Sequence, residues 1–289
     1  MTVDGVSETV SEAGQVERRA VLSGAVVLLG GALVAGAGPA SAAGLTVRSQ
    51  LDRAVRGAIG SRTSSTGLAL VDARTGATYS FNGGWTNECG SIVKVLIVAA
   101  AIRRARSRGA FLDGTQQSWA RRAIVVSDNA AAHALYRYAG GFAAIRSTAA
   151  AFGMGATSRA AAPSSWGRTR TCATDQVALV RGLRYGTGAL RSSDRAYLLE
   201  LMRQVTGSQR WGVGIVDTDA ATTAWLKNGW VPLAPDGSWR VNSVGHVRGH
   251  GRDYSLAILS TRNGSMGSGV ARVDAVSRAV YGSLAQPLR

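Results

Sequence analysis

The sequence contains little cysteine, lysine or glutamate for its length. Two Cys among 289 residues are too few for a disulfide-dense small fold or for a zinc site built on cysteines. Charged residues make up 17% of the chain and hydrophobic residues 46%, a balance that excludes a disordered, collagen-like or coiled-coil protein. The composition therefore indicates an ordinary globular protein with one large domain or two small ones.

Basic residues outnumber acidic residues, and almost all of them are arginine. Lys and Arg total 33 against 17 Asp and Glu, a formal charge of +16, and Lys94 and Lys227 are the two lysines. The arginines are dispersed, and the one tight cluster, residues 103–108, is typical of the solvated end of a helix. We therefore expect no nucleic-acid partner, and we expect an anionic cell wall or membrane surface to be the partner of such a charge.

The first 42 residues have the pattern of an export signal. An arginine pair, Arg18-Arg19, precedes a glycine-rich apolar run over residues 20–34, and Ala40-Ser41-Ala42 is an A-x-A cleavage motif. The pair resembles a twin-arginine signal, although Glu17 stands where Ser or Thr is usual. Because the apolar run is short for a membrane span, we expect cleavage after Ala42, a secreted or extracytoplasmic protein and a charge of +18. A retained weak membrane anchor is the alternative.

Hydrophobic periodicity predicts helices and strands at both ends of the remaining chain and helices alone between them. The predicted helices cover residues 46–58, 91–107, 115–126, 129–139, 141–152, 173–185, 192–205 and 269–284, and the predicted strands cover 67–72, 77–81, 222–230, 238–248 and 253–261. Two terminal segments that share one antiparallel sheet, with a helical insertion, make an α+β fold. We therefore expect one domain over residues 43–289, with an α/β part at about 45–90 and 206–289, a helical part at about 91–205, and the active site at their seam.

Ser91 and Lys94 form the first of three motifs that carry chemistry. They begin a predicted buried helix, and Lys94 lies three residues after Ser91, on the same face. Burial disfavours the charged amine and lowers its pKa, so Lys94 is a candidate acceptor for the Ser91 proton. The helix N-terminus would offer free N–H groups and a positive dipole end to an oxyanion. The alternative is that Ser91 only caps the helix and Lys94 extends to solvent.

Two further motifs follow, Ser127-Asp128-Asn129 between two predicted helices and Lys227-Asn228-Gly229 at the end of a predicted strand. Taken alone, the first is typical of a helix N-cap and the second of a strand that ends in an Asn-Gly turn. With the first motif they give the order S-x-x-K, S-D-N, K-x-G, which includes both lysines of the chain. Lysine shifts its pKa readily when buried and arginine does not, so this distribution indicates a need for amines that can lose a proton.

In this order of motifs the chain resembles the penicillin-recognising serine hydrolases, and most of all the class A β-lactamases. The resemblance spans essentially the whole chain after the export signal and implies a β-lactamase/transpeptidase-like fold. It implies that Ser91 is the acylated nucleophile, Lys94 the acylation base and Ser127 the proton shuttle. The oxyanion hole would consist of the backbone N–H groups of Ser91 and Trp230. The implied substrate-binding residues are Asn129, Lys227, Asn228, Gly229, Trp230 and Arg240.

Three departures from the family pattern bear on function. Class A enzymes activate the deacylating water with a glutamate on the Ω-loop, but the matching residues 158–172 include no Glu or Asp, and Glu88 and Glu200 lie elsewhere. We therefore expect acylation with slow turnover, unless another group activates the water. Asn228 stands where the family has Thr or Ser. The third departure is the step of 36 residues from Ser91 to Ser127, which is short and indicates a trimmed pocket wall.

The sequence thus predicts an exported active-site serine hydrolase that opens β-lactams or related amides through an acyl-Ser91 intermediate, as a monomer without a cofactor. The alternatives are a D,D-peptidase acting on cell-wall peptides with D-Ala-D-Ala-like ends, and a slow-turnover penicillin-binding protein. No metal motif is present, and we expect His246 and His250 at the surface. Cys89 and Cys172 could form a disulfide or remain two buried thiols, and the sequence leaves this choice open.

Overall fold

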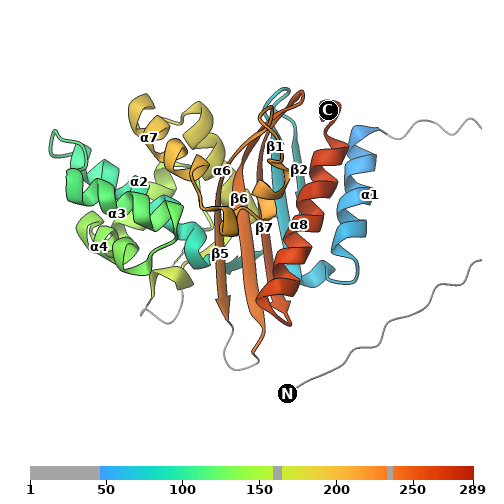
Figure 1. Cartoon of the computed structure of the whole chain (residues 1–289), viewed down its shortest axis with the longest axis horizontal. Coiled ribbons are helices and arrows are strands. Elements are labelled where there is room, and N and C mark those ends of the chain that lie inside the picture. Colours follow the sequence, from blue (N-terminus) through green and yellow to red (C-terminus); the bar gives the residue numbers. More distant parts are fainter. Residues whose placement is uncertain (1–45, 159–164, 233–236) are drawn as a thin grey trace, which may run out of the picture. The chain divides into compact units, whose positions relative to one another are not determined.

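A five-stranded antiparallel sheet, built from both ends of the chain, forms the centre of the computed structural model (Figure 1). The strand order is β2-β1-β7-β6-β5, so β5 lies at one edge. The strands are β1 (Thr66–Asp72), β2 (Thr78–Phe81), β5 (Thr223–Pro232), β6 (Trp239–Gly249) and β7 (Arg252–Asn263). The structure describes residues 46–158, 165–232 and 237–289, and the export signal predicted for residues 1–42 lies outside them.

The register of the sheet joins the N-terminal strands to the C-terminal ones. β1 pairs with β7 from Thr66 opposite Ser260 to Asp72 opposite Tyr254, and β5 pairs with β6 along its whole length. The N-terminal hairpin cannot form the sheet alone, because its buried residues need β7 as a neighbour. The predicted α+β fold, with one antiparallel sheet made by the two chain ends, is therefore confirmed.

Helices cover both faces of the sheet. α1 (Val47–Ile59) and α8 (Met266–Ser283) pack side by side on one face (Figure 1), where Gly269 of α8 meets Val241 of β6. α6 (Ala173–Tyr185) covers the other face, because its Tyr185 contacts His246 of β6. His246 lies five positions after Val241, so the side chains of these two residues point to opposite faces of the sheet. The apolar stripe of α1, Leu51, Val55 and Ile59, is buried as predicted.

The helical part surrounds a single buried helix, α2 (Val93–Arg106). Every residue of α2 from Val93 to Ile102 is buried, which explains why its sequence is apolar on all sides. Its neighbours are α3 (Gly114–Val125), α4 (Asn129–Ala139), α5 (Gly141–Ala151) and α7 (Ser192–Arg203). The start of α2 lies against β5 and β6 through the short helix that precedes it, so the first turn of α2 marks the junction of the two parts.

The short elements were not predicted. β3 (Thr86–Glu88) and β4 (Arg170–Cys172) pair in a second, two-stranded sheet, and three-residue strands are too short to show an alternating pattern. The 3-10 helices are η1 (Thr63–Ser65), η2 (Gly90–Ile92), η3 (Trp166–Arg168), η4 (Gly207–Gln209) and η5 (Gly212–Val216). Across the described ranges, none of the helices is both long and apolar enough to cross a membrane.

Candidate active site

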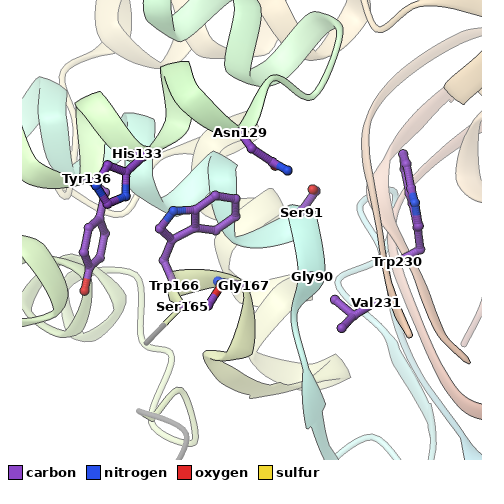
Figure 2. A pocket seen from close by; sticks show the side chains of 10 residues that line it. All are labelled: Gly90, Ser91, Asn129, His133, Tyr136, Ser165, Trp166, Gly167, Trp230 and Val231. Atoms are coloured by element: carbon purple, nitrogen blue, oxygen red, sulfur yellow. The ribbon is translucent and has the colours of Figure 1, made fainter. Parts of the chain in front are cut away.

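Ser91 lies in a tight turn between the small sheet and α2. β3 ends at Glu88, and η2 carries Gly90 and Ser91 ahead of the helix. Gly90 adopts φ +57°, and a Cβ built on it would lie 3.0 Å from the backbone nitrogen of Trp230, so glycine is what lets β5 approach this turn. Cys89 and Ile92, and not Ser91, occupy the N-cap positions of η2 and α2, and Ser91 lines a cavity (Figure 2).

Lys94, in the first turn of α2, is fully buried. Its Nζ donates to the backbone oxygen of Ser127 at 2.5 Å, to Ser127 Oγ at 3.1 Å and to Asn129 Oδ1 at 2.8 Å. Burial lowers the pKa of Lys94 to about 8, although the carboxylate of Asp128 acts in the opposite direction. Three acceptors match the three donors of an ammonium, so the second motif accounts for the hydrogen bonds of Lys94, and none of these hydrogen bonds goes to Ser91.

The turn between α3 and α4 presents the second motif to Lys94. Ser127 has φ +62°, a left-handed conformation that is uncommon for serine and is concentrated at functional sites. Asp128 caps α4, because its side chain accepts from the nitrogen of Ala131 at 2.9 Å, and it also pairs with Arg122. The predicted N-cap role is therefore confirmed for Asp128, and its fixed position directs Ser127 toward Lys94.

The edge strand β5 brings the third motif against η2, which carries the predicted nucleophile Ser91 and is called the nucleophile turn below. A Cβ built on Gly229 would lie 2.7 Å from the nitrogen of Ser91 and 2.6 Å from the oxygen of Cys89, so only glycine allows this contact. Lys227 is fully buried, and its Nζ donates to the backbone oxygen of Asn228 at 2.9 Å. Burial lowers the pKa of Lys227 to about 7, and the charge of Lys94 adds to this effect. The charge of Lys94 therefore reaches Lys227 across the site.

Two side chains predicted to bind substrate have partners within the protein framework. Asn228 Nδ2 donates to the backbone oxygens of Gln209 at 2.7 Å and Trp211 at 2.8 Å, because strand alternation turns Asn228 away from the face of its neighbours in the motif. Arg240 Nη1 lies 3.2 Å from Glu88 Oε2. The Asn228 amide thus ties β5 to the segment before η5, and Arg240 pairs with a buried carboxylate; a role of either side chain in substrate binding stays a prediction.

A cavity of about 420 Å³ opens beside Ser91 (Figure 2), a volume that suits a drug-sized ligand. Figure 2 shows Ser91 between the indoles of Trp166 and Trp230. The described lining contains no carboxylate and comes from the nucleophile turn, α4, the segment around η3 and the end of β5: Gly90, Ser91, Asn129, His133, Tyr136, Ser165, Trp166, Gly167, Trp230 and Val231. The structure therefore brings Ser91, Asn129 and Trp230 to one opening, while Lys94 and Lys227 are fully buried and do not line it.

Three aromatic side chains of the cavity were missed by sequence reasoning. The ring centroid of Trp166 lies 5.2 Å from Lys94 Nζ, and His133 and Tyr136 line the far side of the cavity. His133 and Tyr136 follow Asn129 by four and seven positions, so their helical spacing placed them on the same face of α4 and could have revealed them. Trp166 has no comparable signal, because a single tryptophan in a loop shows no periodicity.

The two cysteines are free and buried. The register of the small sheet places Cys172 opposite Thr86 and not opposite Cys89. The nitrogen of Cys89 donates instead to the backbone oxygen of Thr169 at 2.8 Å. Of the two possibilities that the sequence left open, the structure therefore shows the pair of buried thiols.

The histidines outside the cavity differ in exposure. His250 is exposed as predicted, but His246 is fully buried on β6, where its Nδ1 lies 3.0 Å from Ser255 Oγ and its Nε2 lies 2.8 Å from Asp253 Oδ1. The expectation for His246 was wrong because α6 packs over this part of the sheet, and Tyr185 at its end covers the His246 ring. Within the residues that the structure describes, no group of three or more His, Cys, Asp or Glu could hold a metal ion.

Comparison with solved structures finds similar folds. The β-lactamase from Sphaerobacter thermophilus DSM 20745 is 20% identical, with a TM-score of 0.66 over 83% of this chain and 99% of that one. The TLA-1 extended-spectrum β-lactamase is 14% identical, with a TM-score of 0.72 over 83% of this chain and 100% of that one. The structure of PBP-A is 19% identical, with a TM-score of 0.67 over 81% of this chain and 95% of that one.

A family model also matches the sequence, although no curated protein matches the chain. The pattern of Beta-lactamase2, the β-lactamase enzyme family, matches residues 113–284. That range is more than half of the chain, and it includes the second and third motifs together with most of the cavity lining. The shared fold and this match lead to one conclusion: the chain belongs to the β-lactamase enzyme family.

Proposed function

We propose that this class A β-lactamase-like hydrolase opens β-lactams or related amides through an acyl-Ser91 intermediate. The observation that carries the proposal is the convergence of three distant chain segments on one cavity. Lys94 binds Ser127 and Asn129 by hydrogen bonds, while Gly229 lies against the nitrogen of Ser91. The candidate nucleophile therefore lies at the opening, and the candidate base and proton shuttle are joined by a hydrogen bond.

Acylation begins when neutral Lys94 accepts the proton of the Ser91 hydroxyl and Oγ forms a bond to the substrate carbonyl carbon. The N–H groups of Ser91 and Trp230, which lie where β5 meets the nucleophile turn, are suited to stabilise the oxyanion. The proton then passes from Lys94 to Ser127 Oγ, 3.1 Å away, as Ser127 gives its own proton to the amide nitrogen. The C–N bond breaks and leaves an ester on Ser91.

Lys227 favours substrates that carry a carboxylate. Its ammonium is fully buried, and its hydrogen bond within the described residues goes to the neighbouring carbonyl of Asn228. A buried charge with one neutral acceptor is poorly compensated, so an anionic substrate group would stabilise it. Both a β-lactam and a peptide with a D-Ala-D-Ala-like end supply such a carboxylate.

Hydrolysis of the ester requires an activated water, and the site offers no carboxylate for this step. The described cavity lining lacks Asp and Glu, and so does the sequence over residues 158–172. This observation favours a second candidate function, a penicillin-binding protein that releases its acyl group slowly. A D,D-peptidase with the same three motifs is the third candidate.

A fluorescent penicillin and a chromogenic cephalosporin, followed by intact-protein mass spectrometry, distinguish the candidates. We expect the wild-type protein to gain one penicillin adduct that persists, with slow development of colour, and we expect Ser91→Ala to gain none while keeping its circular dichroism spectrum. Rapid colour without a lasting adduct would identify a β-lactamase with fast turnover, and release of D-Ala from a stem peptide would identify a peptidase. Absence of both adduct and turnover would contradict acylation at Ser91.

We also propose that the protein acts outside the cytoplasm, as a monomer in contact with an anionic cell wall. The export pattern of residues 1–42 and the formal charge of +18 after their removal support this location. N-terminal sequencing of the exported protein should start at Ala43, and light scattering should give the mass of one chain. A full-length protein retained in the cytoplasm would contradict the proposal.

A further inference from the structure

We propose that Trp166 sets the proton affinity of Lys94 through the face of its indole, and that Glu88 is a positioning residue that keeps Trp166 there through Arg168. The catalytic consequence rests on the proposed function, in which Lys94 is the base for Ser91. The contact itself is a property of the folded chain, so it is open to a test that does not require activity.

The indole gives the Lys94 ammonium a contact beyond its hydrogen bonds. Ser127 and Asn129 supply three acceptors, and the Trp166 ring centroid lies 5.2 Å from Nζ. A cation within about 6 Å of an aromatic ring is attracted to the ring, and the attraction is stronger when water is excluded. Because Lys94 is fully buried, water screens this contact little.

The indole acts together with two charged groups that flank Lys94. Asp128, in the α3–α4 turn, favours the charged amine of Lys94, and the charge of Lys94 in turn disfavours the charged form of Lys227 on β5. Burial lowers the pKa of Lys94 to about 8. Removing the indole face takes away a contact that favours the charged form, so the pKa of Lys94 should fall further.

Trp166 depends on contacts outside its own element. Its element, η3, is a three-residue 3-10 helix, too short to be stable by itself. Arg168, at the other end of η3, places its Nη2 3.0 Å from Glu88 Oε1, and Glu88 Oε2 lies 3.2 Å from Arg240 Nη1 on β6. The side chain of Glu88 is 6% exposed, so this buried carboxylate links η3 to the sheet.

The backbone of Glu88 is held independently of its carboxylate. Asn242 Nδ2 donates to the backbone oxygens of Glu88 at 2.8 Å and Cys89 at 3.0 Å. Glu88→Gln therefore leaves the anchoring of the nucleophile turn in place, while it removes the charge that holds Arg168. This makes Glu88→Gln a selective probe of the link to Trp166.

Two lysines in the whole chain make a direct titration possible. Protein labelled with ¹³C at lysine Cε should give two NMR signals, which the variant Lys227→Arg assigns to the two lysines.

Trp166→Leu keeps an apolar cover but loses the ring, and it should lower the pKa of Lys94 by about half a unit to one unit. Trp166→Phe should give a smaller decrease. Trp230→Leu removes the other indole of the cavity and serves as the matched control, with the pKa of Lys94 unchanged.

Glu88→Gln should shift the pKa of Lys94 in the same direction, and the double variant Glu88→Gln/Trp166→Leu should shift it no further than Trp166→Leu alone. Additive shifts would overturn the positioning role of Glu88. An unchanged or raised pKa in both Trp166 variants would overturn the role of the indole. Should the pKa move as expected while the pH profile of Ser91 acylation stays fixed, the inference stands and Lys94 is not the acylation base.

Discussion

Lysine occurs at two positions of this protein, and both are buried where the three motifs meet. Arginine, used 31 times, stays charged in every protein environment and presents a wide planar fork. The burial that lowers the pKa of Lys94 to about 8 and of Lys227 to about 7 would have no such effect on arginine. The residue type at these two positions therefore determines whether the site can transfer a proton near neutral pH.

The rate of Ser91 acylation should rise with pH and level off above about pH 8. Lys94 accepts a proton only in its neutral form, whose fraction increases about tenfold per pH unit below the pKa. Single-turnover adduct formation at saturating penicillin, followed from pH 5.5 to 9 by mass spectrometry, measures this. Lys94→Met should lower the rate by about 10²-fold or more and abolish the rise. A flat wild-type profile would exclude Lys94 as the base.

Lys227→Met should stabilise the protein most at low pH. The pKa of Lys227 is about 7 in the folded protein, whereas the ordinary value for lysine is 10.5, so between these values the unfolded chain binds more protons and wild-type stability rises with pH. Below pH 7 both states are charged, and the full cost of the buried charge is present. Urea midpoints at pH 6, 8 and 10 should show that Lys227→Met is more stable than the wild type, by a margin that shrinks as pH rises. An equal loss of stability at every pH would refute the assigned cost of burying the charge.

β5 carries the site on one face and the framework on the other. Lys227 and Gly229 face the nucleophile turn, whereas Asn228 between them donates its hydrogen bonds to the segment before η5. Because side chains alternate along a strand, a single element supplies both the close approach to Ser91 and the anchor that maintains it. The spacing of K-x-G thus reflects the pleat of the edge strand.

Gly229→Ala should slow acylation by about 10²-fold, since a small displacement of reacting groups is enough for such a loss. Its Cβ would lie 2.6–2.7 Å from backbone atoms of Cys89, Ser91 and Ile92, so either β5 or the nucleophile turn must move. The matched control is Gly264→Ala, where a Cβ would meet nothing within 4 Å and the rate should not change. A wild-type rate for Gly229→Ala would mean that this approach is not needed.

Both chain ends and the helical insertion depend on one another. α1 packs on α8, β1 pairs with β7, and the first turn of α2 meets β5 through η2. The residues of the site extend from Gly90 to Val231, but β5 is held in the sheet by β6, β7 and β1, which lie outside that range. The site can therefore exist only when the whole described domain is folded.

Loss of penicillin labelling and loss of helical circular dichroism should coincide in urea. The fully buried α2 contacts elements of both parts, so the domain should unfold in one cooperative transition. Labelling and far-UV circular dichroism, measured on the same samples across a urea series, provide the two probes. Labelling that disappears at clearly lower urea would show that the site opens separately from the rest.

The longer elements could be predicted from local sequence, and the short ones could not. α1, α4 and α6 lie within a residue of their predicted ranges, because an amphipathic period and a cap are encoded by neighbouring residues. β3, β4 and η3 are three residues long and exist through pairing with distant segments. Since η3 carries Trp166, the sequence could not predict what lies over Lys94.

The sequence by itself determined the chemistry available to this protein: Ser91, Lys94, Ser127 and Lys227 stand out by residue type and spacing, and the periodicity of the flanking segments determines the α+β fold. Only the tertiary structure decided the partners of individual side chains. Arg240 pairs with Glu88 and His246 lies under α6, because a contact between residues far apart in the chain depends on how helices and sheet pack together, which local spacing does not specify.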